Sequence, residues 1–113
     1  MRRGEIRVAS FKPWRGMETG KARPCVIVQA DWLTMESPGT VIVLPLTSQL
    51  WKGAEVLRAE VAARGRLRKT SWVMIDKIQA LDASRFRDGP LGSLGEAEMA
   101  VIDRKLQAVL GMF

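Results

Sequence analysis

Hydrophobic and polar residues alternate at the start of the chain and predict a β-strand over residues 4–11 (GEIRVASF), which Pro13 ends. Two nearly continuous apolar runs follow at residues 25–29 (CVIVQ) and 40–46 (TVIVLPL). Short runs rich in β-branched residues are typical of strands that are buried on both sides. The first half of the chain therefore predicts three strands.

Proline cannot donate a hydrogen bond to a strand ladder, so we expect Pro45 to keep its strand at a terminal or edge position. Residues 30–40 (ADWLTMESPGT) are expected to form a loop. Alternation resumes imperfectly at residues 54–61 (AEVLRAEV), which predict a fourth strand. Residues 72–81 (WVMIDKIQAL) predict a fifth and a sixth strand, interrupted by a charged pair.

The period changes near the C-terminus. Residues 82–86 (DASRF) and 88–92 (DGPLG) have the composition of turns. Ser93 and Glu96 then form a capping-box pattern at the start of a helix, and Gly111 is a stop signal at its end. The apolar residues between them recur at helical spacing: Met99, Ile102, Leu106, Val109 and Leu110.

Short strands followed by one helix predict a mainly β protein with a C-terminal helix, built as a small, partly open barrel or a curved antiparallel sheet. A chain of 113 residues fits one domain, spanning residues 1–113. Hydrophobic residues make up 47% and charged residues 27% of the chain, so it has the composition of a folded globular domain.

The chain carries a formal net charge of +6, which favours an acidic partner such as RNA, DNA, an anionic membrane surface or an acidic protein. It has no histidine and one cysteine. These counts exclude a Ser-His-Asp triad, a His-type metal site and an internal disulfide. We expect Cys25 to be a small buried hydrophobe.

No segment has the apolar length of a membrane span, and the start (MRRGEIRV) lacks the continuous apolar core of a signal peptide. We therefore expect a cytoplasmic protein that does not associate with membranes.

Arg23 precedes one buried strand, and Thr47 follows the next. If these strands are antiparallel neighbours, a guanidinium and a hydroxyl meet at one rim of the sheet. Such a pair suits a phosphate, because arginine binds two oxygens and stays charged while the hydroxyl donates to a third. The residues alone favour the plainer alternative, an exposed arginine and a threonine in an ordinary turn.

Four blocks of the sequence resemble successive blocks of the MazF/PemK toxins, which are mRNA endoribonucleases of bacterial toxin–antitoxin systems. The blocks are RGEIRVASFKPWRGMETGKARPCVIVQ (3–29), VIVLPLTS (41–48), SWVMIDKIQALDASRF (71–86) and LGEAEMAVIDRKLQAVLG (94–111). Their order and spacing make the resemblance fairly specific, and it covers nearly the whole chain.

The resemblance implies an SH3-like barrel of five to seven short strands and a homodimer. It also implies an enzyme that cleaves single-stranded RNA at a short recognition sequence without a metal or cofactor and leaves 2′,3′-cyclic phosphate and 5′-hydroxyl ends. Arg23 matches the family's catalytic arginine, and Thr47 matches its catalytic threonine. Glu18 is the candidate for a general base or for a carboxylate that orients Arg23.

The first loop departs from the family pattern. Many members have Gly-Ser-Glu-Gln where this chain has GMET at residues 16–19, so Met17 replaces a serine and Thr19 is the remaining hydroxyl. Asp76 matches a carboxylate that one branch of the family uses for catalysis, but that branch also needs an arginine where this chain has Met74, and a histidine. We expect Asp76 to be a structural or dimer-contact residue.

RNA contacts are expected from the first loop, from the residues after Thr47 and from the basic turn at residues 64–69 (RGRLRK), which contains no acid. Trp14 and Trp51 are the expected stacking platforms, whereas Trp72 is expected in the core or dimer interface. The expected RNA-binding residues are Trp14, Arg15, Thr19, Lys21, Ser48, Gln49, Arg64, Arg66, Arg68 and Lys69.

The leading hypothesis is thus a toxin ribonuclease that a cognate antitoxin neutralises through an acidic, disordered tail. Two alternatives stay open. One is a non-catalytic relative that poisons a protein such as DNA gyrase, and the other is a degenerate member that binds only antitoxin or DNA.

Overall fold

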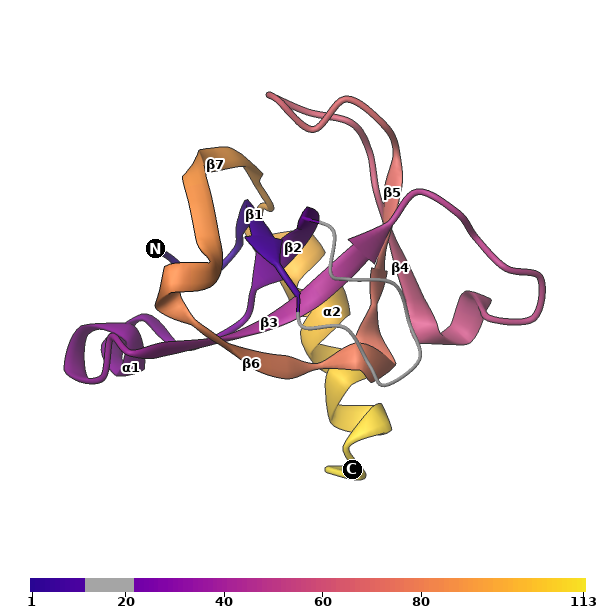
Figure 1. Ribbon diagram of the computed structural model, residues 1–113. Coiled ribbons are helices and arrows are strands. Elements are labelled where there is room, and N and C mark those ends of the chain that lie inside the picture. Colours follow the sequence, from indigo (N-terminus) through magenta and orange to yellow (C-terminus); the bar gives the residue numbers. More distant parts are fainter. Residues whose placement is uncertain (12–21) are drawn as a thin grey trace, which may run out of the picture.

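Seven strands, two α-helices and three 3₁₀ helices make up the computed structural model, which describes residues 1–11 and 22–113 (Figure 1). In chain order they are β1 (Glu5–Ser10), β2 (Ala22–Ile27), α1 (Asp31–Glu36), β3 (Thr40–Thr47), η1 (Glu55–Leu57), β4 (Arg58–Val61), β5 (Ser71–Met74), η2 (Ile75–Lys77), β6 (Gln79–Asp82), η3 (Ala83–Arg85), β7 (Phe86–Ser93) and α2 (Glu96–Val109).

The strands form one antiparallel sheet with the order β4-β5-β3-β2-β1-β7, and β6 pairs with the first half of β3. Among the described residues the ladder does not close into a barrel, because β4 and β7 remain its two ends. A backbone hydrogen bond of 2.7 Å from Arg66 N to Leu91 O ties the β4–β5 turn to β7. The predicted mainly β fold with a C-terminal helix is confirmed, as an open and curved sheet.

Pro45 lies in a central strand, so the prediction that it marks an edge position is wrong. It is the partner of Cys25 on β2. On the other side of β3, β6 pairs with residues 40–43 and β5 pairs with residues 46–47, so Pro45 falls in the gap where β3 changes partners. A missing N–H donor is harmless at this place, because no strand is there to accept from it.

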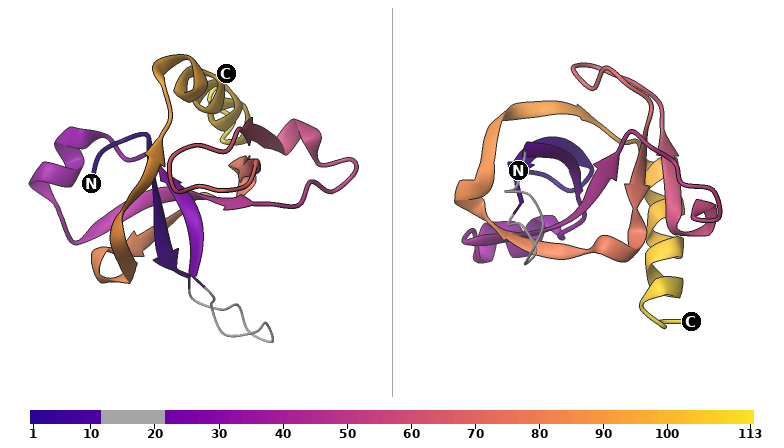
Figure 2. Two further views of the ribbon diagram at one scale, coloured as in Figure 1. Left: turned by 90° about the horizontal axis from the view of Figure 1, so that it is seen from above. Right: turned by 45° about the vertical axis from the view of Figure 1, so that its right-hand side comes forward.

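Apolar residues cover both faces of the central strands, as the continuous runs predicted. One cluster packs beneath α2 and includes Val26, Leu44, Val73, Met99 and Ile102. The second lies on the opposite face. Figure 2 shows α2 along one side of the sheet, with its C-terminal end directed away from the strands. The members of the second cluster are Ala9, Cys25, Ile27, Val41, Val43 and Leu81.

The start of α2 differs from the predicted capping box. Ser93 is the last residue of β7, and Gly95 is the N-cap, whose N–H donates to Glu98 Oε1 at 2.9 Å. The predicted stop is confirmed, since α2 ends at Val109 and Gly111 has a φ of 71°. The apolar stripe of α2 is buried only in its first half: Val109 is 39% and Leu110 is 49% exposed.

Three local predictions are wrong for reasons of tertiary context. Residues 31–36 form helix α1 rather than a loop, and the first half of the predicted strand at residues 54–61 is the 3₁₀ helix η1. The turn-like residues 88–92 lie inside β7, where the register against β1 shifts between Ile6 and Val8 and β7 bulges. Asp88, with a φ of 60°, begins this bulge. The turn-like composition of residues 88–92 thus indicates a local bend within a paired strand.

Within residues 1–11 and 22–113, no helix is long and apolar enough to cross a membrane.

Candidate active site

The start of β2 and the end of β3 form one rim of the sheet, as predicted. These strands are antiparallel neighbours, with Cys25 opposite Pro45 and Val26 opposite Leu44. This pairing ends at Cys25 and Pro45, so Arg23 lies two residues before the last pair and Thr47 two residues after it, at the same end of the ladder. Residues that face each other across an antiparallel ladder have side chains on the same face. The two predicted catalytic residues therefore share one face at one rim.

The hydroxyl of Thr47 is oriented by its own turn. The backbone N–H of Gln49 donates to Thr47 Oγ1 at 3.2 Å. Because the oxygen accepts this bond, its own hydrogen remains available to donate to a ligand. Thr47 is half-buried, whereas Ser48 and Gln49 are exposed beside it. A bound anion at this rim would therefore meet a fixed donor.

Arg23 is exposed, and its backbone is held in the sheet by pairing with Ala9 on β1. Among the carboxylates that the structure describes, none forms an ion pair with Arg23. A guanidinium stays charged at any working pH and offers two parallel donors to phosphate oxygens. The rim thus combines an exposed cation, whose backbone is held in the sheet, with a neutral hydroxyl donor.

Five of the thirteen predicted site residues fall on residues 12–21, which lie outside the described part of the chain. This applies to the candidate base Glu18 and to the Met17 departure. It also applies to the predicted RNA contacts Trp14, Arg15, Thr19 and Lys21.

Arg64, in the basic turn, is engaged by an acid from a distant part of the chain. Its Nη1 and Nη2 donate to Glu98 Oε1 and Oε2 of α2, each at 2.6 Å. This hydrogen-bonded pair lowers the pKa of Glu98 and raises that of Arg64 above its ordinary value. Arg64 also donates to the carbonyl oxygens of Ala62 and Ser93. Its guanidinium fastens the turn to the start of α2.

Arg66 is likewise used within the fold, since its Nη2 donates to the carbonyl oxygens of Gly89 and Pro90 in the β7 bulge at 3.1 and 3.0 Å. Arg68 and Lys69, at the other end of the turn, are exposed, and no described residue forms an ion pair with either. The structure therefore divides the four predicted basic contacts into two that brace the turn and two that face solvent.

Asp76 forms an ion pair with Arg58 of β4, with Nη1 donating to Oδ1 at 2.8 Å. The Arg58 side chain is only 10% exposed. Lys77 Nζ lies 3.7 Å from Asp76 Oδ2. This geometry agrees with the expected structural role for Asp76, which links η2 to the edge strand.

The structure brings Trp72, which the sequence pattern favoured for the core or a dimer interface, next to Thr47 at the rim. Trp72 is the Cα partner of Thr47 on one side and of Glu60 on the other. It is half-buried, whereas Val73 beside it is fully buried beneath α2. The alternation in SWVM contained this information, because a buried Val73 requires Trp72 to lie on the opposite face.

Cys25 is fully buried, as expected, and burial raises the pKa of its thiol to about 12. A thiol in this environment is inert, so Cys25 is not a nucleophile of the site.

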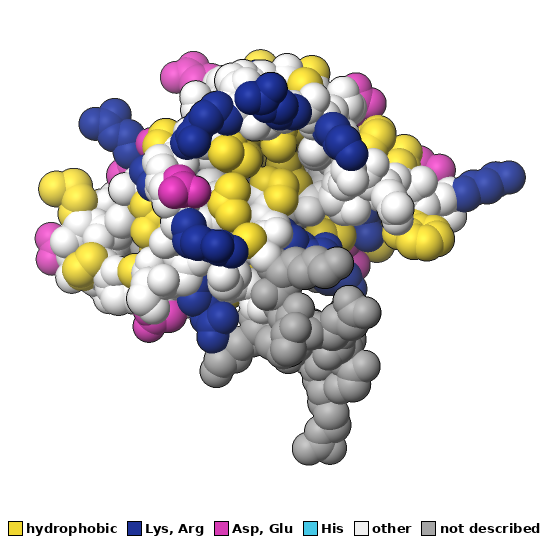
Figure 3. Space-filling model, turned by 45° about the horizontal axis from the view of Figure 1, so that its top comes forward, with side chains coloured by type: hydrophobic (Ala, Val, Ile, Leu, Met, Phe, Trp, Pro, Cys, Tyr) yellow, Lys and Arg dark blue, Asp and Glu magenta, His cyan; other side chains and the backbone are white. Residues whose placement is uncertain are grey.

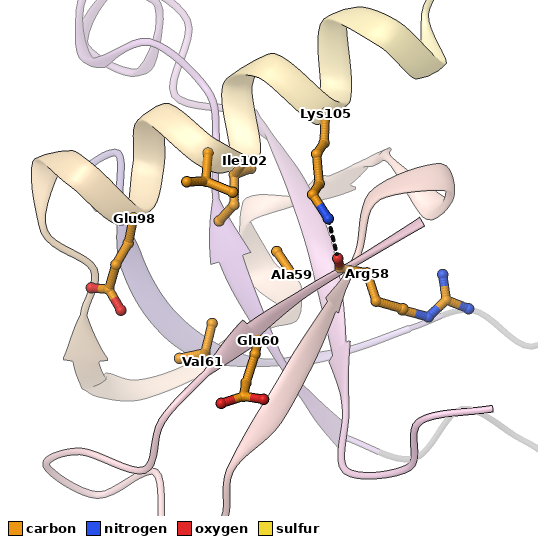
Figure 4. Close-up of a pocket in the computed structure, with 8 residues that line it drawn as sticks. Arg58, Ala59, Glu60, Val61, Glu98, Ile102 and Lys105 are labelled. Carbon is orange, nitrogen blue, oxygen red and sulfur yellow. Dashed lines mark hydrogen bonds between the residues drawn. The ribbon is translucent and has the colours of Figure 1, made fainter. Parts of the chain in front are cut away.

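A pocket of about 200 Å³ lies between β4 and α2 (Figure 4). Ala59, Val61 and Ile102 line its apolar part, and Lys105 Nζ donates to the Arg58 carbonyl oxygen at 2.8 Å across its end. This pocket is on the α2 side of the sheet, opposite the face that carries Thr47. It is therefore separate from the rim.

Figure 3 shows a face of the molecule on which Lys and Arg side chains surround an area of hydrophobic side chains. Apolar contact area within a positive field suits a ligand that has both flat bases and phosphates. Among residues 1–11 and 22–113, no three His, Cys, Asp or Glu side chains are grouped in a way that could hold a metal ion.

Comparison with known proteins identifies the class to which this fold and rim belong. Residues 2–110 match the model of a family described as PemK-like, MazF-like toxin of type II toxin–antitoxin system. The chain is also 34% identical over 113 residues to a Staphylococcus epidermidis protein named Endoribonuclease MazF, and the match covers 99% of this chain and 92% of the relative. The chain belongs to the PemK/MazF toxin family, which confirms the resemblance seen in the sequence.

Solved structures give the same fold. An endoribonuclease in complex with its cognate antitoxin from a mycobacterial species superposes with a TM-score of 0.79 at 22% identity, over 100% of this chain and 97% of that one. A MazE–MazF complex from Deinococcus radiodurans gives a TM-score of 0.78 at 24% identity, again over 100% and 97% of the two chains. These similarities establish the MazF-like arrangement of the sheet and the C-terminal helix.

Proposed function

We propose that this protein is a single-domain toxin endoribonuclease, spanning residues 1–113, that cuts single-stranded mRNA within a short recognition sequence. The observation that supports the proposal is the rim, because Arg23 of β2 and Thr47 of β3 lie at the same end of one antiparallel ladder and the Thr47 hydroxyl, which accepts from Gln49, keeps its own hydrogen to donate. Family membership and the endoribonuclease named among its relatives support the same activity.

The reaction uses side chains of this chain, the 2′-hydroxyl of the substrate and water. The 2′-oxygen of the substrate attacks the adjacent phosphorus, the bond from phosphorus to the 5′-oxygen breaks, and the products are a 2′,3′-cyclic phosphate and a 5′-hydroxyl. Arg23 stabilises the negative charge that develops on the phosphoryl oxygens, and Thr47 donates to one of them. Glu18 is the proposed acceptor of the 2′-hydroxyl proton, and the departing 5′-oxygen takes up a proton from water.

Neither a metal nor a cofactor has a role in this scheme, because the guanidinium of Arg23 supplies the positive charge at the phosphate. RNA outside the scissile phosphate would contact Ser48, Gln49, Arg68 and Lys69, together with Trp14, Arg15, Thr19 and Lys21. We assign Arg64 to the fold, because its Nε, Nη1 and Nη2 all donate within it. Arg66 braces the turn through Nη2 alone and is exposed, so it stays among the proposed RNA contacts.

Two protein partners belong to the proposal. The first is a cognate antitoxin whose acidic segment competes with RNA for the basic rim; antitoxins are present in complexes of structural relatives. The second is another copy of this chain. Leu110, Met112 and Phe113 are 49%, 66% and 80% exposed at the end of α2, and pairing two such ends would bury them. The site of action would be the cytoplasm, where mRNA is translated.

The test is incubation of the purified protein with a long single-stranded RNA in EDTA, followed by mapping of the new ends, with Arg23→Ala as the control. Discrete cuts with 5′-hydroxyl and cyclic phosphate ends that vanish in Arg23→Ala would support the proposal. Intact RNA would overturn it and would favour a poison of DNA gyrase or a binder of antitoxin or DNA alone.

A further inference from the structure

Three side chains of different chemistry form one row across the sheet, and Arg23 lies near its end. Thr47 on β3 is the partner of Trp72 on β5, and Trp72 is the partner of Glu60 on β4. Arg23 on β2 lies beyond Thr47 at the same end of the sheet, two residues before the last β2–β3 pair of Cys25 and Pro45. Antiparallel partners have Cα atoms about 4.5–5.5 Å apart, so Trp72 is one strand from the hydroxyl and two strands from the guanidinium.

The whole row faces away from α2. Val73, Ala59 and Val61, which alternate with Trp72 and Glu60 along β5 and β4, are buried in the cluster beneath α2. Figure 4 shows the Glu60 side chain directed away from α2, whereas Ala59 and Ile102 lie between the strand and the helix. Glu60 is exposed and Trp72 is half-buried. Both side chains are therefore on the face that carries Thr47.

The order of groups along the row matches the order of groups in a nucleotide. A cation and a hydroxyl donor come first, and these bind phosphate. An indole follows, and unpaired bases stack on aromatic rings in most single-strand RNA sites. The Glu60 carboxylate ends the row. It can only accept hydrogen bonds, and it repels phosphate. RNA bound with its scissile phosphate at Arg23 would thus place a base, and not another phosphate, over Trp72 and Glu60.

We propose that Trp72 and Glu60 determine the sequence specificity of the site by holding the nucleobase next to the scissile phosphate. Trp72 stacks on this base, and the Glu60 carboxylate accepts a hydrogen bond from its exocyclic amino group. Adenine, cytosine and guanine carry such a group, and uracil does not. This inference rests on the proposed RNA cleavage, and it assigns to β4 and β5 a part of the substrate that the Arg23–Thr47 pair does not contact.

The first test compares Trp72→Phe and Trp72→Leu, with Trp32→Leu as the matched control. Trp32 is a 68% exposed tryptophan on α1, which precedes β3 and lies at the opposite end of this strand from Thr47. Each variant is titrated with an oligonucleotide of the cleaved sequence that carries 2′-deoxyribose at the cleaved nucleotide, so that binding is measured without reaction. The same variants are assayed for cleavage of the all-ribose oligonucleotide and for thermal unfolding.

Trp72→Leu is expected to weaken binding by roughly 5- to 150-fold, which is the range for loss of base–aromatic stacking, while Trp72→Phe keeps most of the affinity. Trp32→Leu should match the wild type. Equal affinity of Trp72→Leu and wild type would overturn the proposal for Trp72. If Trp72→Leu unfolds, two other results would overturn the proposal: a folded Trp72→Ser that binds with full wild-type affinity, or a folded Trp72→Phe that binds roughly 5-fold more weakly or worse.

The second test is Glu60→Gln, which changes an exposed residue and keeps its shape. A glutamine both donates and accepts, so the variant should cut sequences with uracil at one position that the wild type rejects. A uniform rise in cleavage of all sequences would mean that Glu60 acts only by repelling phosphates, and would overturn its assignment. Failure of the proposed function would give a different result, because the wild type itself would then leave RNA intact.

Discussion

Arg23 and Arg64 are both arginines in basic stretches of the sequence, but the structure gives them opposite surroundings. Arg23 stands exposed at the start of β2, with no ion pair to any described carboxylate. Arg64 is held by both oxygens of Glu98 and by two backbone carbonyls. Hence a positive residue contributes to ligand binding only where the fold leaves its donors unused, and the two arginines should respond to mutation in opposite ways.

The largest effect is expected for Arg23→Ala. Removal of a charged donor from a developing phosphorane typically costs 10²–10³-fold or more in rate, because the charge is stabilised in the transition state. Single-turnover cleavage of a defined oligoribonucleotide measures the loss. The free energy of unfolding should stay within about 0.5 kcal/mol of wild type, since the side chain is exposed. Full activity of Arg23→Ala would remove this residue from the mechanism.

Thr47→Val should follow, with a loss of roughly 10- to 100-fold in the rate of cleavage. Valine keeps the branched shape and the strand but deletes the hydroxyl, and a hydrogen bond to a charged group contributes about 1.5–3 kcal/mol. Thr47→Ser, which keeps the hydroxyl and its bond from Gln49, is the matched control and should retain most of the activity. Similar losses in both variants would point to packing rather than to the hydroxyl.

A smaller contrast is expected between Arg64→Ala and Arg68→Ala. Arg64→Ala should lower the free energy of unfolding by about 1–2 kcal/mol, because it removes a bidentate pair and leaves carbonyls without a donor. Arg68→Ala should leave stability unchanged and reduce the salt dependence of RNA binding by about 0.7 in log–log slope, the value for one phosphate contact on a single strand. Urea unfolding and binding titrations over a salt series measure both. Loss of stability in Arg68→Ala, with a reduced salt dependence in Arg64→Ala, would contradict the assignment of Arg64 to the fold and of Arg68 to RNA binding.

The smallest effect is expected on the stability of the protein at acidic pH. Hydrogen bonding to Arg64 holds the pKa of Glu98 below its ordinary value of 4.5. The pair therefore contributes stability above about pH 4.5, and this contribution is lost as the pH falls through the lowered pKa. It should amount to less than about 1 kcal/mol because both side chains are partly exposed. Glu98→Gln should flatten the fall in unfolding free energy between about pH 5 and pH 3; an unchanged slope would mean that the pair contributes nothing.

The sequence predicted what depends on local pattern. The buried runs became β2 and β3, and their adjacency placed Arg23 and Thr47 at one rim. The partners of each side chain depend on tertiary contacts, which one chain does not reveal. Glu98 lies 34 residues from Arg64 in sequence, so the absence of an acid within the basic turn was misleading. Pro45 could occupy a central strand only because β5 and β6 leave a gap beside it.

Trp72 illustrates the same limit. Its position at the start of an apolar run favoured the core or a dimer interface, and pairing with Thr47 and Glu60 sets it, half-buried, on the face opposite α2. Helix α1 was missed because its six residues bury no side chain fully and show no periodic apolar face. Burial on both faces of a strand can be inferred from the sequence. Which strand pairs along each of its edges cannot.

The most direct measurement compares Arg23→Ala and Arg64→Ala on one RNA oligonucleotide, with cleavage and thermal unfolding recorded on the same samples below the unfolding transition. The account predicts that the two variants lose different properties. Arg23→Ala unfolds like the wild type and does not cut, whereas Arg64→Ala unfolds at a lower temperature and cuts at the wild-type rate. Loss of cleavage in a folded Arg64→Ala, together with full cleavage by Arg23→Ala, would contradict it.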